Sequence, residues 1–436
     1  MSLTILLIII FLVGIAMVAF EEQIGINKSA TALFMSVAMW VTIALNGTPV
    51  GAEVVAEQLG EVSETLFFVM GALVIVELID LHGGFKVISD SIRTPSKRKL
   101  LWIIAILTFL LSAILDNIAT AVIMLALSRK FVFDQRSRWI YSGMIILAAN
   151  AGGSFSPVGD VTTILLWTGG NLTPGHQIAS VLPAALTFML VPLLIVNFCY
   201  FKKGELLEAA PQSHSEAGIE SHGTVVSKFH STMLLILGVS TMALVPFFQN
   251  WSTLPPFMRI LLGLSIMWIY TDLMYRSKSL GALPSGSKYR VGSVLSRIDM
   301  STILFFLGVL MSVGAMKVAG SLVEIGEGLE SAVGGHPLVI SFVIGIMSSF
   351  VDNVALVAAT QGMYPLAEVG TYVVNSEFWT FLAYCAVTGG SLLIIGSATG
   401  VTVMGVEKLT FGYYLKRFSL LALLGYIAGA AVFILL

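Results

Sequence analysis

The sequence predicts an all-α polytopic membrane protein in which two re-entrant hairpins and two broken transmembrane helices form an inverted repeat. Three observations support this prediction: a low charge content, apolar runs of unequal length, and two Asp-Asn pairs inside such runs. Of the 436 residues, 57% are hydrophobic and 11% are charged, whereas about a quarter of the residues of a soluble domain are charged. This composition excludes a soluble globular protein, and the net charge of -2 gives no indication of nucleic-acid binding.

Four apolar runs have lengths that do not fit a single crossing. A straight membrane-spanning helix needs about 20 residues. The runs at 100–127, 139–168, 337–364 and 378–407 are too long for one crossing and too short for two. Each of them also contains an Asp-Asn pair or a cluster of Gly, Ser and Pro. We therefore expect the helix to be interrupted in all four.

The flanking charges predict how the two runs with an Asp-Asn pair enter the membrane. Lys and Arg mark cytoplasmic loops. They flank the run 100–127 on both sides, so this run should be a hairpin that enters from the cytoplasm and turns at Asp116-Asn117. The run 337–364 has acidic flanks without Lys or Arg, so it should enter from the outside. With these hairpins, the remaining runs give about ten crossings, with both ends of the chain outside.

The expected organisation has an additional first span, two repeats and a linker. Residues 1–28 contain the first crossing, which lacks the basic start and the cleavage site of a signal peptide. The first repeat covers 29–201, with its hairpin at 100–127 and its broken helix at 139–168; the second covers 229–436, with the corresponding parts at 337–364 and 378–407. The polar stretch 202–228 is predicted to be a cytoplasmic linker. Cys199 and Cys385 lie in apolar runs and indicate no disulfide framework.

Two motifs recur in the two halves at almost the same spacing. Asp116-Asn-x-Ala matches Asp352-Asn-x-Ala at an offset of 236 residues, and Gly152-Gly-Ser matches Gly389-Gly-Ser at an offset of 237. Because the flanking charges are opposite, the halves should point in opposite directions. In transporters with inverted repeats, the binding site lies near the bilayer midplane between the repeats. An ionisable residue at that depth is expensive, which makes it a candidate for function.

The polar residues of these motifs offer oxygen donors, which suit a small monovalent cation. Hard cations prefer oxygen ligands, whereas soft metals prefer sulfur and imidazole, and no Cys or His belongs to the set. We expect Na⁺ or Li⁺ to bind at Asp116, Asp160 and Asp352. The full set of expected ion- and proton-binding residues is Asp116, Asn117, Asp160, Thr162, Asp352 and Asn353, supported by Ser112, Asn150, Ser154, Ser156, Ser349, Thr388, Ser391, Ser397 and Thr399.

The same carboxyl groups should also bind protons. Burial and mutual repulsion raise the pKa of carboxylic acids, whereas a bound cation stabilises the charged form. Na⁺ and H⁺ should therefore compete for one site. If that site faces the two sides of the membrane in turn, the result is exchange of Na⁺ or Li⁺ for H⁺, with no enzymatic reaction and no cofactor. Asp160 corresponds to Ser397 in the second half, so the site should be asymmetric.

The paired Asp-Asn hairpins and the two Gly-Gly-Ser segments resemble the NhaD-type sodium/proton antiporters of the ion transporter superfamily. The segments concerned are Asn150-Ala-Gly-Gly-Ser-Phe-Ser-Pro-Val-Gly-Asp-Val-Thr-Thr163 and Thr388-Gly-Gly-Ser-Leu-Leu-Ile-Ile-Gly-Ser-Ala-Thr-Gly400. The resemblance covers nearly the whole chain. It implies exchange of Na⁺ or Li⁺ for H⁺ in the bacterial inner membrane, a homodimer, and a transport part that moves as a unit against a scaffold. It assigns the ion-binding roles to both Asp-Asn pairs and to Asp160, with Thr162 beside it.

Two other functions fit parts of the pattern. A sodium-coupled anion or dicarboxylate transporter could use the same architecture, but Asp116 and Asp352 would repel an anion. An intramembrane aspartyl protease needs two neighbouring aspartates, one of them with a raised pKa. The segment Val158-Gly-Asp160 lacks the glycine pattern expected for such an enzyme. Cation/proton exchange is therefore favoured over both alternatives.

Overall fold

The computed structural model describes residues 3–19, 21–46, 51–86, 92, 94–202, 204–207, 227–245, 254–276 and 291–436. These residues form helices and no strand, apart from one isolated bridge between Ser96 and Leu206. The predicted all-α class is therefore confirmed. Most of the expected linker, residues 208–226, lies outside the described residues.

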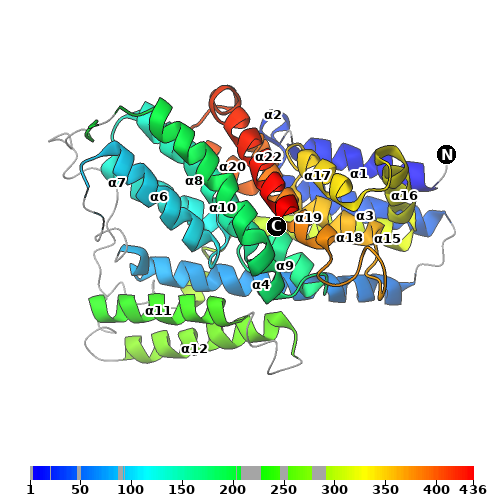
Figure 1. Cartoon of the computed structure of the whole chain (residues 1–436). Helices are drawn as coiled ribbons and strands as arrows, with labels where there is room; N and C mark the ends of the chain where they lie inside the picture. The colour runs from blue at the N-terminus through cyan, green and yellow to red at the C-terminus, as the bar shows by residue number, and fades with distance from the viewer. Residues whose placement is uncertain are drawn as a thin grey trace.

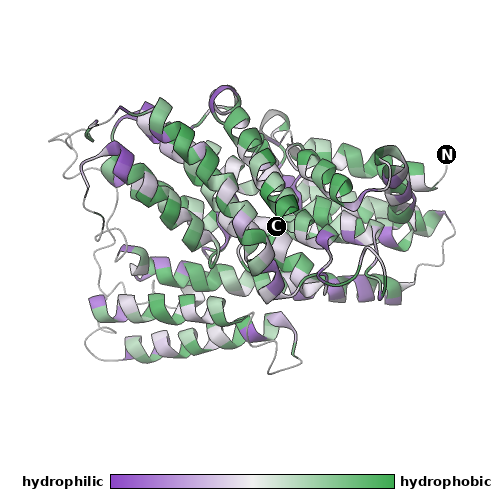
Figure 2. Cartoon of the chain, in the orientation of Figure 1, coloured by the Kyte–Doolittle hydropathy of each residue, from purple (hydrophilic) through white to green (hydrophobic). Residues whose placement is uncertain are grey.

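Six helices of the described part are long and apolar enough to cross a membrane, which makes the chain a multi-pass membrane protein. Figure 2 shows hydrophobic residues along the length of most helices. The six are α3 (Lys28–Leu45), α4 (Ala52–Leu81), α10 (Pro174–Cys199), α12 (Pro256–Arg276), α15 (Met300–Val318) and the continuous helix Phe411–Leu435, which comprises α21 (Phe411–Tyr414), a π-helical turn (Leu415–Ser419) and α22 (Leu420–Leu435).

The first group of helices packs around α4 and α15. Helix α15 lies against both α3 and α4, and α4 also contacts α11 (Lys228–Leu244) and α12. Helix α1 (Leu3–Ala19) packs on α3. In Figure 1, α4, α11 and α12 lie side by side along the lower edge of the molecule.

The second group contains the four apolar runs that the sequence analysis singled out. The first run with an Asp-Asn pair forms α6 (Lys97–Ser112) and α7 (Asn117–Phe131), and the second forms α17 (Pro337–Met347) and α18 (Asn353–Met363). The Gly/Ser-containing runs form α8 (Gln135–Phe155) with α9 (Val161–Thr168), and α19 (Glu377–Gly389) with a short 3₁₀ turn (Ile394–Gly396) and α20 (Ala398–Glu407). Helix α10 packs against α8 and α19, and α22 packs against α10 and α19.

Three shorter helices complete the described part. They are α2 (Glu21–Ile24), α14 (Val291–Leu295) and α16 (Ser321–Val333). Helix α16 meets α17 at a bend of 109°. Its three glutamates, Glu324, Glu327 and Glu330, therefore lie before the second Asp-Asn run on a segment with a different direction.

Local chemistry explains why each of the four runs is interrupted. In all four, the second helix begins directly after a residue whose side chain accepts a hydrogen bond from a backbone N–H of the first turn: Asp116, Asp160, Asp352 and Ser397. Asp and Ser are favoured at this position because they satisfy donors that have no partner in the helix. Proline adds to the break after α8, because the residue before a proline avoids helical geometry.

The interrupted helices pack very closely, and glycine makes this possible at two matching positions. A Cβ atom on Gly152 would overlap the carbonyl oxygen of Phe109, and a Cβ atom on Gly389 would overlap that of Gly345. Helix α8 thus meets α6, and α19 meets α17, at backbone-to-backbone contact. These contacts bring the two Asp-Asn segments toward the breaks after α8 and α19.

Candidate ion-binding site

The three aspartates of the predicted site occupy the same structural position in three different helices. Asp116 accepts a hydrogen bond from Ile118 N at 3.0 Å, at the start of α7. Asp352 accepts one from Val354 N at 3.0 Å, at the start of α18. Asp160 accepts one from Thr162 N at 2.8 Å, at the start of α9. Each carboxylate therefore lies at the positive end of a helix dipole, which stabilises negative charge.

Asp160 lies at the centre of the arrangement and contacts both Asp-Asn segments. Asn117 Nδ2 donates a short hydrogen bond to Asp160 Oδ2. Asn353 Nδ2, from the other half of the chain, lies 3.5 Å from each oxygen of the same carboxylate. All three side chains are buried, and Asp160 is only 2% exposed. The asparagines of the two Asp-Asn pairs therefore meet at one carboxylate.

Asn150 forms a second connection between the halves. Its side-chain oxygen accepts a hydrogen bond from Asn117 Nδ2 at 3.1 Å. Its Nδ2 donates to Ser391 Oγ at 2.8 Å and to Ser397 Oγ at 3.1 Å, both in the second half of the chain. Asn150 is fully buried. This one side chain satisfies its donors and its acceptor by joining the breaks of two different helices.

The predicted Ser112 and the corresponding Ser348 make the same contact in the two halves. Ser112 Oγ donates to the carbonyl oxygen of Ala149, and Ser348 Oγ donates to that of Ala386, both at 2.6 Å. Each bond ties the end of the first helix of an Asp-Asn segment to the helix beside it. Four other predicted residues bond within their own segments: Ser154 to Ala151 O, Ser349 to Ile346 O, Thr388 to Tyr384 O, and Ser156 by accepting from Val158 N.

Two threonine hydroxyls of the site, those of Thr162 and Thr399, are fully buried. The Oγ1 atom of Thr399 makes no hydrogen bond within the described part of the chain, whereas the hydroxyl of Thr162 lies beside the carboxylate of Asp160. A buried polar group without a partner carries a desolvation cost of about 1–3 kcal/mol. Both hydroxyls belong to the first turn of the helices that begin after Asp160 and Ser397. They are therefore available as oxygen ligands.

The charges around the site are predominantly negative. Asp116 and Asp352 are each close enough to Asp160 to interact with its charge. Within the described residues, however, no three His, Cys, Asp or Glu side chains come together as a metal-binding group. In this conformation, Asp160 is surrounded by amides and a backbone N–H rather than by the other two carboxylates.

The sequence analysis missed two polar residues beside the site. Lys28 is close enough to Asp352 to interact with it electrostatically, and its ammonium lies 5.2 Å from the centre of the Phe305 ring. Gln177 is fully buried in α10 and donates to Ser154 O at 3.3 Å. A lone Gln inside an apolar run and a Lys directly before one were the available signals, but neither belongs to the repeated motifs.

Comparison with known proteins gives consistent results. The model of the citrate transporter family (CitMHS) matches residues 12–381. Sodium/proton antiporter 1 of Arabidopsis thaliana is 38% identical over 98% of this chain and 71% of its own length, and sodium/proton antiporter 2 of the same plant is 36% identical over 98% of both. The Na⁺/H⁺ antiporter NhaD of Halomonas elongata is 28% identical over 98% of this chain and 87% of its own length.

By its fold and by this similarity, the protein is a membrane transporter and not an enzyme, which removes the aspartyl protease alternative. The chain belongs to the NhaD-type sodium/proton antiporters within the citrate transporter family. The resemblance stated from the sequence is thereby confirmed.

Proposed function

We propose that this transporter exchanges Na⁺ for H⁺ at a single site centred on Asp160. The observation that carries the proposal is the position of this carboxylate: it is buried, and the asparagines of both Asp-Asn pairs contact it. A buried carboxylate can hold either a proton or a small cation, but a cation and a proton stabilise opposite states of the group. Competition between the two ions follows from this property.

The surrounding groups have distinct roles in this mechanism. Asn117 and Asn353 orient the carboxylate of Asp160, and the first turn of α9 stabilises its charged form through Thr162 N. The buried hydroxyls of Thr162 and Thr399 are the candidate neutral ligands of Na⁺. Asp116 and Asp352 add the negative charge that attracts the cation and take up protons as it leaves.

We also propose that residues 29–201 and 229–436 form an inverted repeat with re-entrant hairpins at 100–127 and 337–364. The matching serine and glycine contacts of the two halves support the repeat, and the flanking charges support the opposite directions. Labelling single cysteines introduced at the exposed positions Lys99 and Arg136 tests the first hairpin. Both should react from the cytoplasmic side, whereas reaction from opposite sides would exclude it.

Transport of Li⁺, a homodimeric state and a bacterial inner membrane belong to the same proposal. Li⁺ follows from the oxygen ligands, which suit small hard cations. The resemblance to NhaD-type antiporters supports the dimer and the inner membrane, although the relatives come from a plant as well as from bacteria. Size-exclusion chromatography with light scattering would test the dimer.

Transport of citrate or another carboxylate is the second candidate, because the matching family model is described as a citrate transporter. The three aspartates oppose it, since they would repel a carboxylate unless protonated. Proteoliposomes that contain a pH-sensitive dye and receive Na⁺, Li⁺, K⁺ or citrate in turn separate the two candidates. Proton movement driven by Na⁺ without citrate supports exchange, whereas movement that requires citrate would overturn it.

The roles of Asp116 and Asp352 are tested in the same liposomes. Asp116→Asn and Asp352→Asn keep an oxygen that can cap the helix but remove the charge. We expect each to reduce Na⁺-driven proton movement by about tenfold or more, while the purified protein keeps its elution volume in size-exclusion chromatography. Near-normal exchange in both variants would contradict the mechanism.

A further inference from the structure

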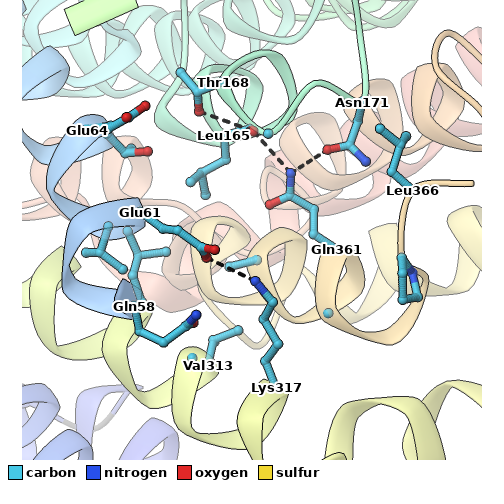
Figure 3. Close-up of a pocket in the computed structure, with 18 of the residues that line it drawn as sticks. Gln58, Glu61, Glu64, Leu165, Thr168, Asn171, Val313, Lys317, Gln361 and Leu366 are labelled. Atoms are coloured by element: carbon cyan, nitrogen blue, oxygen red, sulfur yellow. Dashed lines mark hydrogen bonds and ion pairs between the residues drawn. The ribbon is translucent and has the colours of Figure 1, made fainter. Parts of the chain in front are cut away.

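The structure contains a cavity of about 700 Å³ that the exchange mechanism described above does not use. Its walls come from α4 and α15 on one side and from α9 and α18 on the other, and Val323 of α16 also lines it. Figure 3 shows the cavity between these helices. The cavity therefore lies between the helix group around α4 and α15 and the helices that begin at the ion site.

The wall formed by α4 presents a row of oxygen-bearing side chains. Gln58, Glu61, Glu64 and Thr65 all line the cavity, with spacings that place them on neighbouring positions of one helix face. Gln58 is only 7% exposed, and its amide has no hydrogen-bond partner among the described residues. In Figure 3, its side chain points toward the α15 wall of the cavity. Its amide oxygen is therefore free to accept a ligand inside the cavity.

The charges of the cavity favour a cation. Lys317 Nζ forms an ion pair with Glu61 Oε2 at 3.0 Å, whereas no described residue forms an ion pair with Glu64. Among the charged side chains that line the cavity, the carboxylate of Glu64 is therefore not neutralised by an ion pair. The C-terminal ends of α9 and α18 also face the cavity through Thr168, Gly169, Gln361 and Gly362, and helix C-termini carry partial negative charge.

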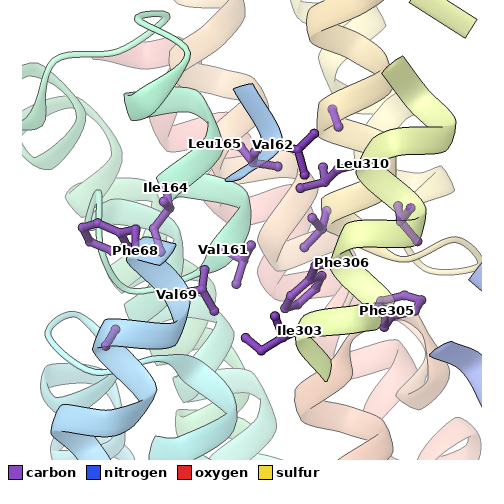
Figure 4. Close-up of a cluster of buried hydrophobic side chains, with 14 of the residues drawn as sticks. Val62, Phe68, Val69, Val161, Ile164, Leu165, Ile303, Phe305, Phe306 and Leu310 are labelled. Carbon is purple, nitrogen blue, oxygen red and sulfur yellow. The ribbon is translucent and has the colours of Figure 1, made fainter. Parts of the chain in front are cut away.

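The cavity and the ion site lie at opposite ends of the same helix. Helix α9 begins directly after Asp160 and ends at Thr168, which lines the cavity. Its eight residues span about 12 Å at 1.5 Å per residue. Apolar side chains of α4, α9 and α15 pack along this length, including Val62, Leu165 and Leu310, which also line the cavity (Figure 4). This apolar layer separates the cavity from the site.

We propose that the cavity is an entrance site where a hydrated alkali cation binds weakly before it reaches Asp160. Glu64 supplies the attracting charge, Gln58 supplies an uncharged oxygen, and Lys317 competes with the cation for Glu61. The inference rests on the proposed exchange of Na⁺ for H⁺ and names where the cation first binds. Because Lys317 already neutralises Glu61, removal of the Glu64 charge should weaken cation binding, whereas removal of the Lys317 charge should strengthen it.

The experiment compares three variants in proteoliposomes by the dependence of proton movement on Na⁺ concentration. Glu64→Gln should raise the apparent KM for Na⁺ by about three- to tenfold with little change in the maximal rate, because a focusing charge acts on ion capture. Lys317→Gln should lower the apparent KM, because it frees Glu61. Both effects should appear only when Na⁺ is added on one face of the membrane, and both should shrink when choline chloride screens the charges.

Glu57→Gln is the matched control, because Glu57 is an exposed carboxylate on the same helix that does not line the cavity. If Glu64→Gln behaves like Glu57→Gln, or if Lys317→Gln raises the KM, the entrance site is wrong. Failure of the entrance site differs from failure of the proposed function, because only the absence of Na⁺-driven proton movement in the unmodified protein would overturn the latter. Exposed positions such as Glu64 and Lys317 leave folding intact, which thermal unfolding of each variant checks.

Discussion

The two halves of the ion-binding region share their backbone packing but differ in their charge. Ser112 and Ser348 donate to equivalent carbonyl groups, and Gly152 and Gly389 allow equivalent close contacts. Yet the residue that precedes the second helix of the break is Asp160 in one half and Ser397 in the other. The two halves thus share their framework contacts but differ in charge at one of the helix breaks.

A second difference lies at the far ends of the same helices. Helices α7 and α8 are joined to α20 by charge, because Arg129 Nε of α7 lies 2.5 Å from Glu407 Oε1 and Arg138 Nε of α8 lies 3.4 Å from the other carboxylate oxygen. Helix α18 is joined to α9 and to the residues after it by neutral groups, because Gln361 Nε2 donates to Leu165 O at 3.1 Å and to Asn171 Oδ1 at 2.6 Å. Gln361 and Asn171, which form this hydrogen bond between side-chain amides, also line the cavity.

The largest expected effect distinguishes the two residues at the helix breaks. Asp160→Asn should reduce Na⁺-driven proton movement in proteoliposomes about 100-fold or more, because it removes the central ionisable group. Ser397→Ala should reduce it less than about tenfold, since it removes one neutral hydrogen-bond partner of Asn150. Equal effects of the two substitutions would show that charge at the centre does not decide the exchange.

The second prediction concerns the shared framework. Gly152→Ala and Gly389→Ala should each lower the free energy of unfolding by about 1–3 kcal/mol, because the added methyl group collides with a backbone carbonyl that cannot easily move. Thermal unfolding in detergent measures this as a lower Tm. Gly405→Ala is the control, since nothing lies within 4 Å of its added Cβ. A large loss in only one half would indicate that the two contacts are not equivalent.

The third prediction compares the far ends. Glu407→Gln should lower the free energy of unfolding by about 1–3 kcal/mol, because Glu407 is buried and two partly exposed arginines lose its charge. Gln361→Ala should cost about 1 kcal/mol, as expected for neutral hydrogen bonds. Tm values measured in detergent at low and high salt distinguish the charged contact of Glu407 from the neutral hydrogen bonds of Gln361. Salt should reduce the difference between Glu407→Gln and the unmodified protein but should leave Gln361→Ala unchanged.

The smallest expected effect again tests the equivalence of the halves. Ser112→Ala and Ser348→Ala each remove one buried hydrogen bond to a carbonyl group. We expect each to cost about 1 kcal/mol, so their Tm values should agree within a few degrees. If the two losses in the free energy of unfolding differed by more than about twofold, the two contacts would not be equivalent.

The sequence predicted much of this arrangement because its main signals are local. Composition is sufficient to predict the all-α membrane class, and an Asp or Ser that can cap a helix marks each interruption. The central position of Asp160 was not predictable in this way, because it depends on two asparagines 236 residues apart that meet only in the folded chain. The same holds for the contact of Asn150 with Ser391.

The predicted supporting residues show a further limit of sequence analysis. Ser349 and Thr388 bond to carbonyl groups of their own segments rather than to the centre of the site. Ser and Thr in helices often do so, and this choice cannot be distinguished from ligation by residue type or spacing. Conversely, the acidic and basic residues around the cavity lie at or near the ends of apolar runs in the sequence, where charged residues are ordinary.

The connection through Asn150 has a consequence for how access to the ion changes. A motion that opened the site between the two halves would have to break its buried bonds to Ser391 and Ser397. A displacement of the joined helices as one body against α4 and α15 would leave these bonds intact, because both partners of each bond would move together. The contact with α4 and α15 in Figure 4 consists of hydrocarbon side chains, so such a displacement would cost fewer buried hydrogen bonds.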